Sequence, residues 1–146
     1  MVELVSSWSR DPSTKVGAVI VDEENNVRSV GYNGFPRNVD DNREDRWNDR
    51  TVKYKFAEHA ERNAIYAAAR HGTSIERCKM YLGWFPCADC ARAIIQVGIK
   101  HVIIDGRKYD GSDPRDERWA EDFRIAKEMF EEAEVDIQIV SKEQLI

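Results

Sequence analysis

Apolar and polar positions are grouped in blocks that predict two strands near the N-terminus and alternating strands and helices later. The β-branched run at residues 16–22 is followed by a turn-forming segment at 23–26 and a second apolar run at 27–32. This order is typical of a β-hairpin. Three further apolar runs predict strands, at residues 78–82, 101–105 and 135–140.

Helical patterns lie between the later strands. Residues 60–70 are rich in alanine and stop before Gly72, and residues 88–97 form a second candidate helix. A longer amphipathic helix is predicted where four side chains share one face: Trp119, Phe123, Ala126 and Phe130. Because consecutive parallel strands need a crossover connection, this alternation predicts a three-layer α/β/α arrangement. We expect one domain over residues 1–146.

The segment between residues 34 and 56 is polar and charged and has little periodicity. Ordered loops of this length are uncommon and are often lids or flexible segments. We therefore expect a loop here that covers a site, with Trp47 exposed on it.

Composition narrows the class of protein. The chain has 146 residues, 42% of them hydrophobic, and a net charge of −5. No apolar run is long enough to span a membrane, and the first residues lack the pattern of a signal peptide, so we expect a cytoplasmic protein. Because binding to a long nucleic acid usually needs a basic face, a small nucleotide is the more natural partner.

The candidate chemistry lies in two short motifs, His59-Ala-Glu61 and Pro86-Cys87-Ala-Asp-Cys90. Both occur where a loop enters a predicted helix, and the helix N-terminus favours thiolates. One imidazole and two thiolates are the three protein ligands of a catalytic zinc, which keeps a fourth position open. Glu61 is placed to take a proton from water and to pass it to a leaving amine.

Other interpretations of these residues explain less. A structural zinc would need a fourth ligand, and the spare candidates Cys78, His71 and His101 have no ligand-like spacing. A redox pair of cysteines would leave His59 and Glu61 without a role. A zinc-stabilised binding or assembly module would have no reason to keep the Glu61 carboxylate. The combined pattern is the one found in zinc-dependent nucleobase deaminases, with one zinc per chain.

Longer stretches extend this similarity. Residues 11–21, 31–36, 59–65, 85–90 and 93–100 resemble the deoxycytidylate (dCMP) deaminase family of the cytidine-deaminase-like superfamily. The resemblance implies a mixed five-stranded sheet flanked by helices and the conversion of dCMP to dUMP. The alternative is a sister deaminase that acts on dCTP, a 5-substituted dCMP or a free nucleobase.

The resemblance also implies roles for individual residues. Asn33 would contact the deoxyribose, although turn geometry alone also explains an Asn-Gly pair. Ala60 would present its backbone to the base, and Tyr109 would lie near the phosphate. In the family, a segment matching Gly31, Tyr32 and Gly34 contributes to a site for the effectors dCTP and dTTP, usually within a homo-oligomeric hexamer.

The phosphate-binding residues have the weakest signal. Five cations lie on plausible loops, namely Arg10, Lys15, Arg37, Arg43 and Lys108, and Arg10 and Lys15 are the candidates we choose. Some family members bind a second zinc in the long insert, but residues 34–58 contain neither His nor Cys, so we expect none here. Trp84 has no family role, and packing beside the site is the interpretation we favour.

Overall fold

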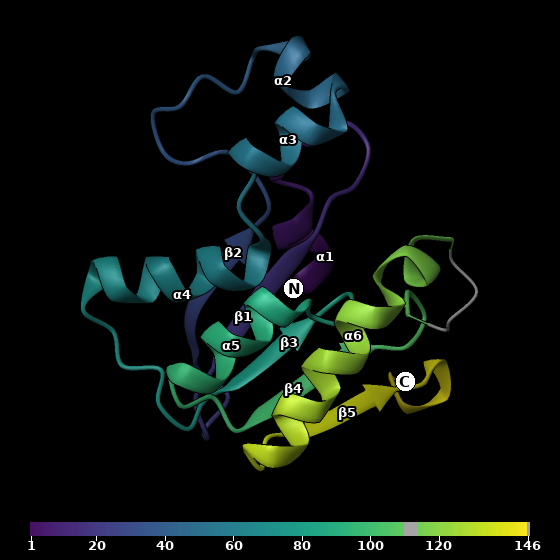
Figure 1. The fold of residues 1–146 in the computed structure, drawn as a ribbon. Coiled ribbons are helices and arrows are strands. Elements are labelled where there is room, and N and C mark those ends of the chain that lie inside the picture. The colour runs from purple at the N-terminus through teal and green to yellow at the C-terminus, as the bar shows by residue number, and fades with distance from the viewer. Residues whose placement is uncertain (110–113, 146) are drawn as a thin grey trace.

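The computed structural model describes residues 1–109 and 114–145, and its centre is a sheet of five strands in the order β2-β1-β3-β4-β5 (Figure 1). The strands are β1 Gly17–Val21, β2 Val27–Tyr32, β3 Lys79–Leu82, β4 His101–Asp105 and β5 Asp136–Val140. All five lie where the apolar runs predict them.

The sheet is mixed, as expected. Strand β1 pairs antiparallel with β2 and also with β3, and the hairpin register shifts between Ile20 and Val21. Strands β3, β4 and β5 are parallel, so that His101 lies opposite Lys79 on one side and Asp136 on the other. Helices connect the parallel strands, because consecutive parallel strands need a long crossover connection.

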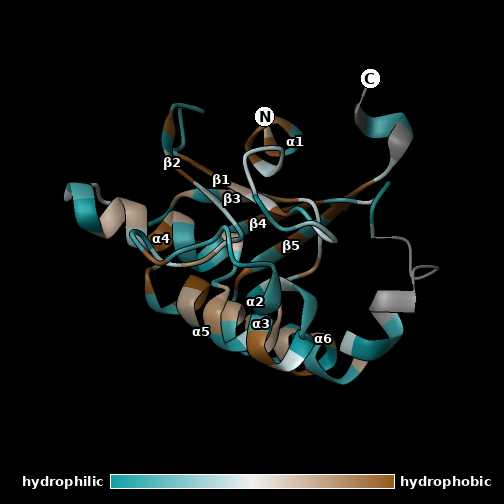
Figure 2. Ribbon diagram, turned by 90° about the horizontal axis from the view of Figure 1, so that it is seen from above, coloured by the Kyte–Doolittle hydropathy of each residue, from teal (hydrophilic) through white to brown (hydrophobic). Residues whose placement is uncertain are grey.

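Helices cover the two faces of the sheet unequally. Figure 2 shows α4 (Ala60–His71), α5 (Ala88–Gln96) and α6 (Pro114–Glu132) on one face and α1 (Val2–Ser6) on the other. Val5 of α1 packs against Val19 and Val21 of β1. This is the predicted three-layer α/β/α arrangement, with a short element as its third layer.

Small residues let α4 lie very close to the hairpin. A Cβ atom added to Gly31 of β2 would come within 2.2 Å of the Ala64 backbone nitrogen, so only glycine fits there. Ser29, on the same strand, donates a hydrogen bond to the Ala64 carbonyl at 2.7 Å. Gly72 ends the helix in the left-handed conformation, with φ of 65°.

The insert differs from the expected loop, because it contains two helices, α2 (Glu44–Asn48) and α3 (Arg50–Phe56). Figure 1 shows them together at one end of the molecule. Asp49 caps α3, since its carboxylate accepts hydrogen bonds from the backbone nitrogens of Thr51 and Val52.

Trp47 holds this insert together, and the expectation that it is exposed is wrong. Its side chain is 8% exposed and stacks on Phe35 with a centroid distance of 4.1 Å. Its indole N–H donates to the Asp41 carbonyl at 2.9 Å, and the Arg46 guanidinium lies over Phe56. The apolar residues of the segment are too few to show a period, but they suffice for a small local core.

The C-terminus finishes with a 3-10 turn, Lys142–Leu145. Within the described residues, no helix combines the length and the apolar character that a bilayer crossing requires.

Candidate metal centre and catalytic cavity

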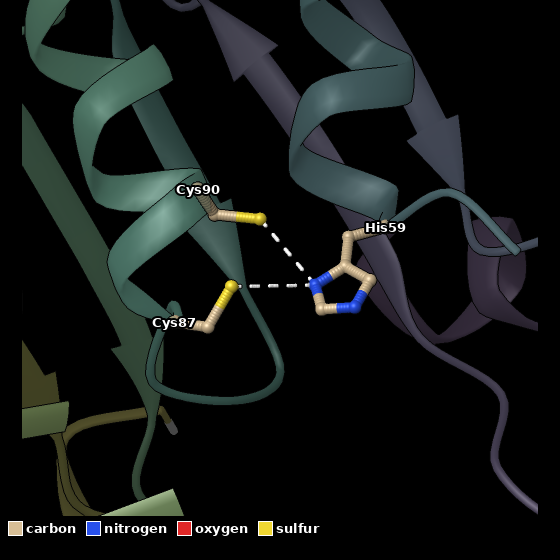
Figure 3. Close-up of side chains that lie close together, drawn as sticks. All are labelled: His59, Cys87 and Cys90. Atoms are coloured by element: carbon tan, nitrogen blue, oxygen red, sulfur yellow. Dashed lines mark hydrogen bonds between the residues drawn. The ribbon is translucent and has the colours of Figure 1, made fainter. Parts of the chain in front are cut away.

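Two neighbouring helices begin at the candidate metal ligands. His59 is the N-cap residue of α4 and Cys87 is the N-cap residue of α5, while Cys90 lies in the first turn of α5. Figure 3 shows both sulfur atoms directed at the imidazole ring from the neighbouring helix. The sheet therefore joins two motifs that are 28 residues apart in the sequence.

The distances in this group fit a tetrahedral zinc ion. His59 Nδ1 lies 3.5 Å from the Sγ atom of Cys87 and 3.5 Å from that of Cys90. Zinc bonds of about 2.3 Å to sulfur and 2.0–2.1 Å to nitrogen at a tetrahedral angle would place nitrogen and sulfur about 3.5 Å apart. The three side chains form the one group of potential ligands of this kind among the described residues.

The pKa values of the two cysteine thiols shift in opposite directions. The Cys90 thiol donates a hydrogen bond to Cys87, and this bond lowers the pKa of the Cys87 thiol. Burial opposes the change, but His59 adds to it, and the pKa of Cys87 falls to about 4. The same hydrogen bond and burial raise the pKa of Cys90. The bond to Cys87 also raises the pKa of His59. One thiolate thus forms readily, and a divalent cation would supply the charge that stabilises the second.

Glu61 lies two residues after His59 in the first turn of α4 and is 6% exposed. Burial raises the pKa of its carboxyl, and the neighbouring imidazole of His59 offsets part of that rise. A carboxyl group with a raised pKa returns a proton more readily after accepting one than does a carboxyl group in water.

A cavity of about 160 Å³ opens beside these residues. Its wall includes His59, Glu61 and Cys87 at one end and aromatic side chains from three other elements. These are Tyr54, Trp84, Phe85, Trp119 and Phe123. Because a void of about 150 Å³ holds a benzene ring, a pyrimidine ring fits this space.

Comparison with known proteins identifies the family. The profile described as "Cytidine and deoxycytidylate deaminase zinc-binding region" matches residues 1–105. The chain belongs to this family. It is therefore a zinc-dependent deaminase, and His59, Cys87 and Cys90 are the residues that can hold the zinc.

Curated relatives support this assignment over most of the chain. An uncharacterized deaminase of Aliivibrio fischeri is 42% identical over 94% of this deaminase and 86% of its own length. Human deoxycytidylate deaminase is 43% identical over 75% of this chain, which spans 63% of the human protein. The enzyme of phage T4 is 36% identical over 76% of both chains.

Solved structures agree with the fold. The dCMP deaminase of cyanophage S-TIM5, crystallised with dCMP and dUMP, superposes with a TM-score of 0.70 at 25% identity. The match covers 95% of this deaminase and 90% of the phage chain. The mixed five-stranded sheet expected from the sequence is thus the fold of this family.

Of the residues expected to contact substrate, Asn33 and Ala60 line the cavity of the deaminase. The Asn33 amide nitrogen donates to Asp11 and to the Thr14 carbonyl, while its oxygen accepts from the Val16 backbone nitrogen at 2.8 Å. A carbonyl oxygen has two lone pairs, so Asn33 Oδ1 can accept one more hydrogen bond.

Tyr109 is not among the residues of the described cavity wall, and its expected position near the phosphate stays a prediction. Its ring packs against Phe85 at 5.5 Å and against Phe123 at 5.7 Å, and both of these rings line the cavity. Trp84 packs against the core, as expected, and it also lines the cavity.

The two cations chosen for phosphate binding do not line the cavity. The Arg10 guanidinium is directed toward the insert, where it contacts Asp41 at 3.0 Å and Asn42 at 2.7 Å. Lys15 is exposed. The cationic side chains of the wall are Lys53 and Arg118.

The segment expected to bind effectors has structural contacts of its own. Tyr32 is 40% exposed and meets the Trp8 ring edge-on at 6.1 Å. Gly34 forms a bridge with Glu58 through two backbone hydrogen bonds of 3.1 and 2.8 Å. Gly31 is required by its contact with α4.

Sequence reasoning missed the cavity residues that come from the insert and from α6, namely Lys53, Tyr54 and Arg118. The Asp49 cap before residues 50–53 was the available signal for α3. Helix α6 also supports the metal end directly, because Asp122 Oδ2 accepts a hydrogen bond of 2.6 Å from the Ala88 backbone nitrogen.

Proposed function

We propose that this deaminase hydrolyses dCMP to dUMP and ammonia. The observation that carries the proposal is the position of Glu61, buried in the same cavity wall as His59 and Cys87. The human, phage T4 and cyanophage relatives that carry the name dCMP deaminase support the choice of substrate.

The ligand set fits the family's metal. When zinc is bound by His59, Cys87 and Cys90, it makes a water molecule acidic enough to act as a nucleophile at neutral pH. Two thiolates and a neutral imidazole balance the charge of a divalent cation, so the ligand end of the cavity carries no large excess charge.

Glu61 moves the protons in this scheme. Its carboxylate takes a proton from the attacking water and gives it to the ring nitrogen N3 of the base. The new bond joins oxygen to C4, and the bond between C4 and the exocyclic nitrogen then breaks. Glu61 transfers the second proton of the water to the departing amine, which leaves as ammonia. The raised pKa of Glu61 suits a group that must carry protons in both directions.

The remaining contacts position the nucleotide. Ala60 lines the cavity beside Glu61, and we propose that its backbone bonds to the base edge. Asn33 Oδ1 can accept a hydrogen bond from a sugar hydroxyl, since its amide is held by Thr14 and Val16. Tyr109 contacts the wall residue Phe85, and we propose that it lies near the phosphate.

Replacement of Glu61 tests the catalytic assignment. Glu61→Gln keeps the shape of the side chain but removes the base, and general acid–base catalysis contributes on the order of 10²- to 10⁴-fold. We expect a loss of that size with one zinc per chain still bound by elemental analysis. Glu44→Gln, on the exposed start of α2, is the matched control and should retain full turnover. Substantial activity of Glu61→Gln would contradict the assignment.

A substrate panel tests the name of the substrate. Ammonia release should be fastest with dCMP when it is compared with CMP, dCTP, 5-methyl-dCMP, deoxycytidine and cytosine. A clear preference for any other member would replace dCMP by that compound and leave the deaminase class intact.

We further propose that the chain assembles into a homo-oligomer and responds to dCTP and dTTP through the Gly31, Tyr32 and Gly34 segment. Exposed apolar side chains support assembly, including Leu4 at 60% and Trp8 at 50%. Light scattering should give a multiple of 16.9 kDa. In the dCMP assay, dCTP should activate and dTTP should inhibit, and Tyr32→Ala should weaken both responses.

A further inference from the structure

Two cationic side chains reach the cavity wall, one from the insert and one from α6. Lys53 comes from α3 and Arg118 from α6. Among the described residues of the wall, these two are the Lys and Arg side chains that an anionic group of a substrate in the cavity could contact.

Lys53 is already committed to other groups. Its ammonium lies 2.6 Å from Asp11 Oδ2 and donates to Ser13 Oγ at 2.9 Å. Its side chain is 14% exposed and that of Asp11 is 2% exposed. Because a buried carboxylate that loses its partner is costly, Lys53 remains with Asp11 rather than turning to a ligand.

The other two carboxylates of the wall, those of Glu58 and Glu61, do not pair with Arg118 either. Glu58 Oε1 accepts from Arg62 Nε at 2.6 Å, and Glu61 is buried at the metal end. No ion pair joins Arg118 to a carboxylate of residues 1–109, 117–141 or 143–144, the parts of the chain whose side chains are described. Arg118 is therefore the cation of the cavity wall whose charge is not neutralised within the described part of the chain.

The neighbouring residue ties Arg118 to the metal end of the cavity. Trp119 lies edge-on to the His59 ring at 6.3 Å and to the Tyr54 ring at 6.3 Å. Arg118 itself is exposed while still lining the cavity, so it lies where the cavity meets solvent. A base directed at His59 and Glu61 would leave its 5′ end at this open side.

We infer that Arg118 binds the 5′-phosphate of the nucleotide and so selects monophosphates over nucleosides. The inference rests on the proposed dCMP activity. A guanidinium presents paired N–H groups that match two phosphate oxygens, and such charge-assisted bonds are stronger than neutral ones. Arg118 lies beyond residues 1–105, so the family profile that covers the metal ligands does not include it.

Equilibrium binding and turnover of the zinc-loaded chain test this role with two ligands that differ only in phosphate. Arg118→Ala should weaken binding of dCMP, and raise its KM, by about tenfold or more, while binding of deoxycytidine changes much less. Arg118→Lys should recover part of the loss, because it keeps the charge but not the paired geometry. Arg124→Ala is the matched control on the same helix, since Arg124 is exposed and pairs with Glu121 and Glu128.

The outcomes separate this inference from the proposed function. Equal losses for dCMP and deoxycytidine, or a dCMP affinity of Arg118→Ala equal to that of Arg124→Ala, would overturn the role of Arg118. Phosphate-dependent binding through Arg118 without any ammonia release would support Arg118 and overturn the dCMP activity. Thermal unfolding of each variant shows whether a loss comes from the fold.

Discussion

Lys53 and Asp11 form a buried ion pair that fastens the insert to the loop before β1, with 2.6 Å between the ammonium and the carboxylate. Asp11 also accepts hydrogen bonds from Ser13 and from the backbone nitrogen of Thr14. Through its contact with Asn33, the same carboxylate holds the side chain proposed to meet the sugar.

Removing the cation of this pair should destabilise the protein. Lys53→Met leaves the Asp11 carboxylate buried and unpaired, which costs about 3–5 kcal/mol in free energy of unfolding. Urea unfolding measures the loss. Lys55→Met is the matched control, because Lys55 lies on the same helix and is exposed, and it should change stability by less than about 0.5 kcal/mol. Equal effects of the two variants would show that the pair is not stabilising.

The same ion pair predicts that the free energy of unfolding falls at acid pH. Burial opposes ionisation of Asp11, but the bonds from Lys53, Ser13 and Thr14 outweigh it and lower its pKa below 3.8. Because the folded pKa is depressed, the stabilisation is present above pH 3.8 and is lost as the pH falls through the folded value. Asp11→Asn should show a flatter dependence of unfolding free energy on pH in this acid window. A parallel curve for the two proteins would contradict the assignment.

Zinc should stabilise the fold through Cys87 and Cys90. Cys87→Ser should lose bound zinc and unfold at a lower temperature, and a chelator should lower the melting temperature of the unaltered chain in the same way. Cys78 is also buried but lies outside the ligand group, so Cys78→Ala should retain zinc. Elemental analysis with thermal unfolding distinguishes these variants. Zinc loss from Cys78→Ala alone would argue for a different ligand set.

Two glycines of the proposed effector segment should differ sharply on substitution by alanine. At Gly31 the new Cβ would lie 2.2 Å from the Ala64 nitrogen and 2.3 Å from the Ala60 carbonyl, so β2 and α4 must separate. We expect a cost of about 3 kcal/mol or more from this overpacking. At Gly34 no atom lies within 4 Å of the new Cβ, and denaturant unfolding should show little change. A stable Gly31→Ala variant would mean that the helix and hairpin can separate cheaply.

Strands, main helices and metal ligands could all be predicted from the sequence, because each depends on neighbours in the chain. Strand β1 is a continuous β-branched run, and the His59 and Cys87 motifs sit at helix starts whatever the rest of the fold does. Local structure of this kind can be recognised from the periodicity of apolar residues.

The helices of the insert and the cations of the cavity wall could not be predicted, because they depend on contacts across the fold. Helix α2 has five residues, too few for a periodic signal, and the burial of its Trp47 involves stacking on Phe35, which lies outside that helix. Arg10 and Arg118 look alike in the sequence, yet Arg10 is directed toward Asp41, while Arg118 lines the cavity. Loop membership does not give the direction of a side chain.

The bond between Asp122 and Ala88 has a consequence for synthesis. A ribosome delivers His59, Cys87 and Cys90 well before it delivers Asp122, so the ligands exist while the first amide of α5 still lacks its protein acceptor. When α6 packs against α5, Asp122 accepts the hydrogen bond from this amide, and Trp119 joins the cavity wall. A growing chain thus gains its metal ligands early, and the α6 side of its cavity wall only after α6 has emerged.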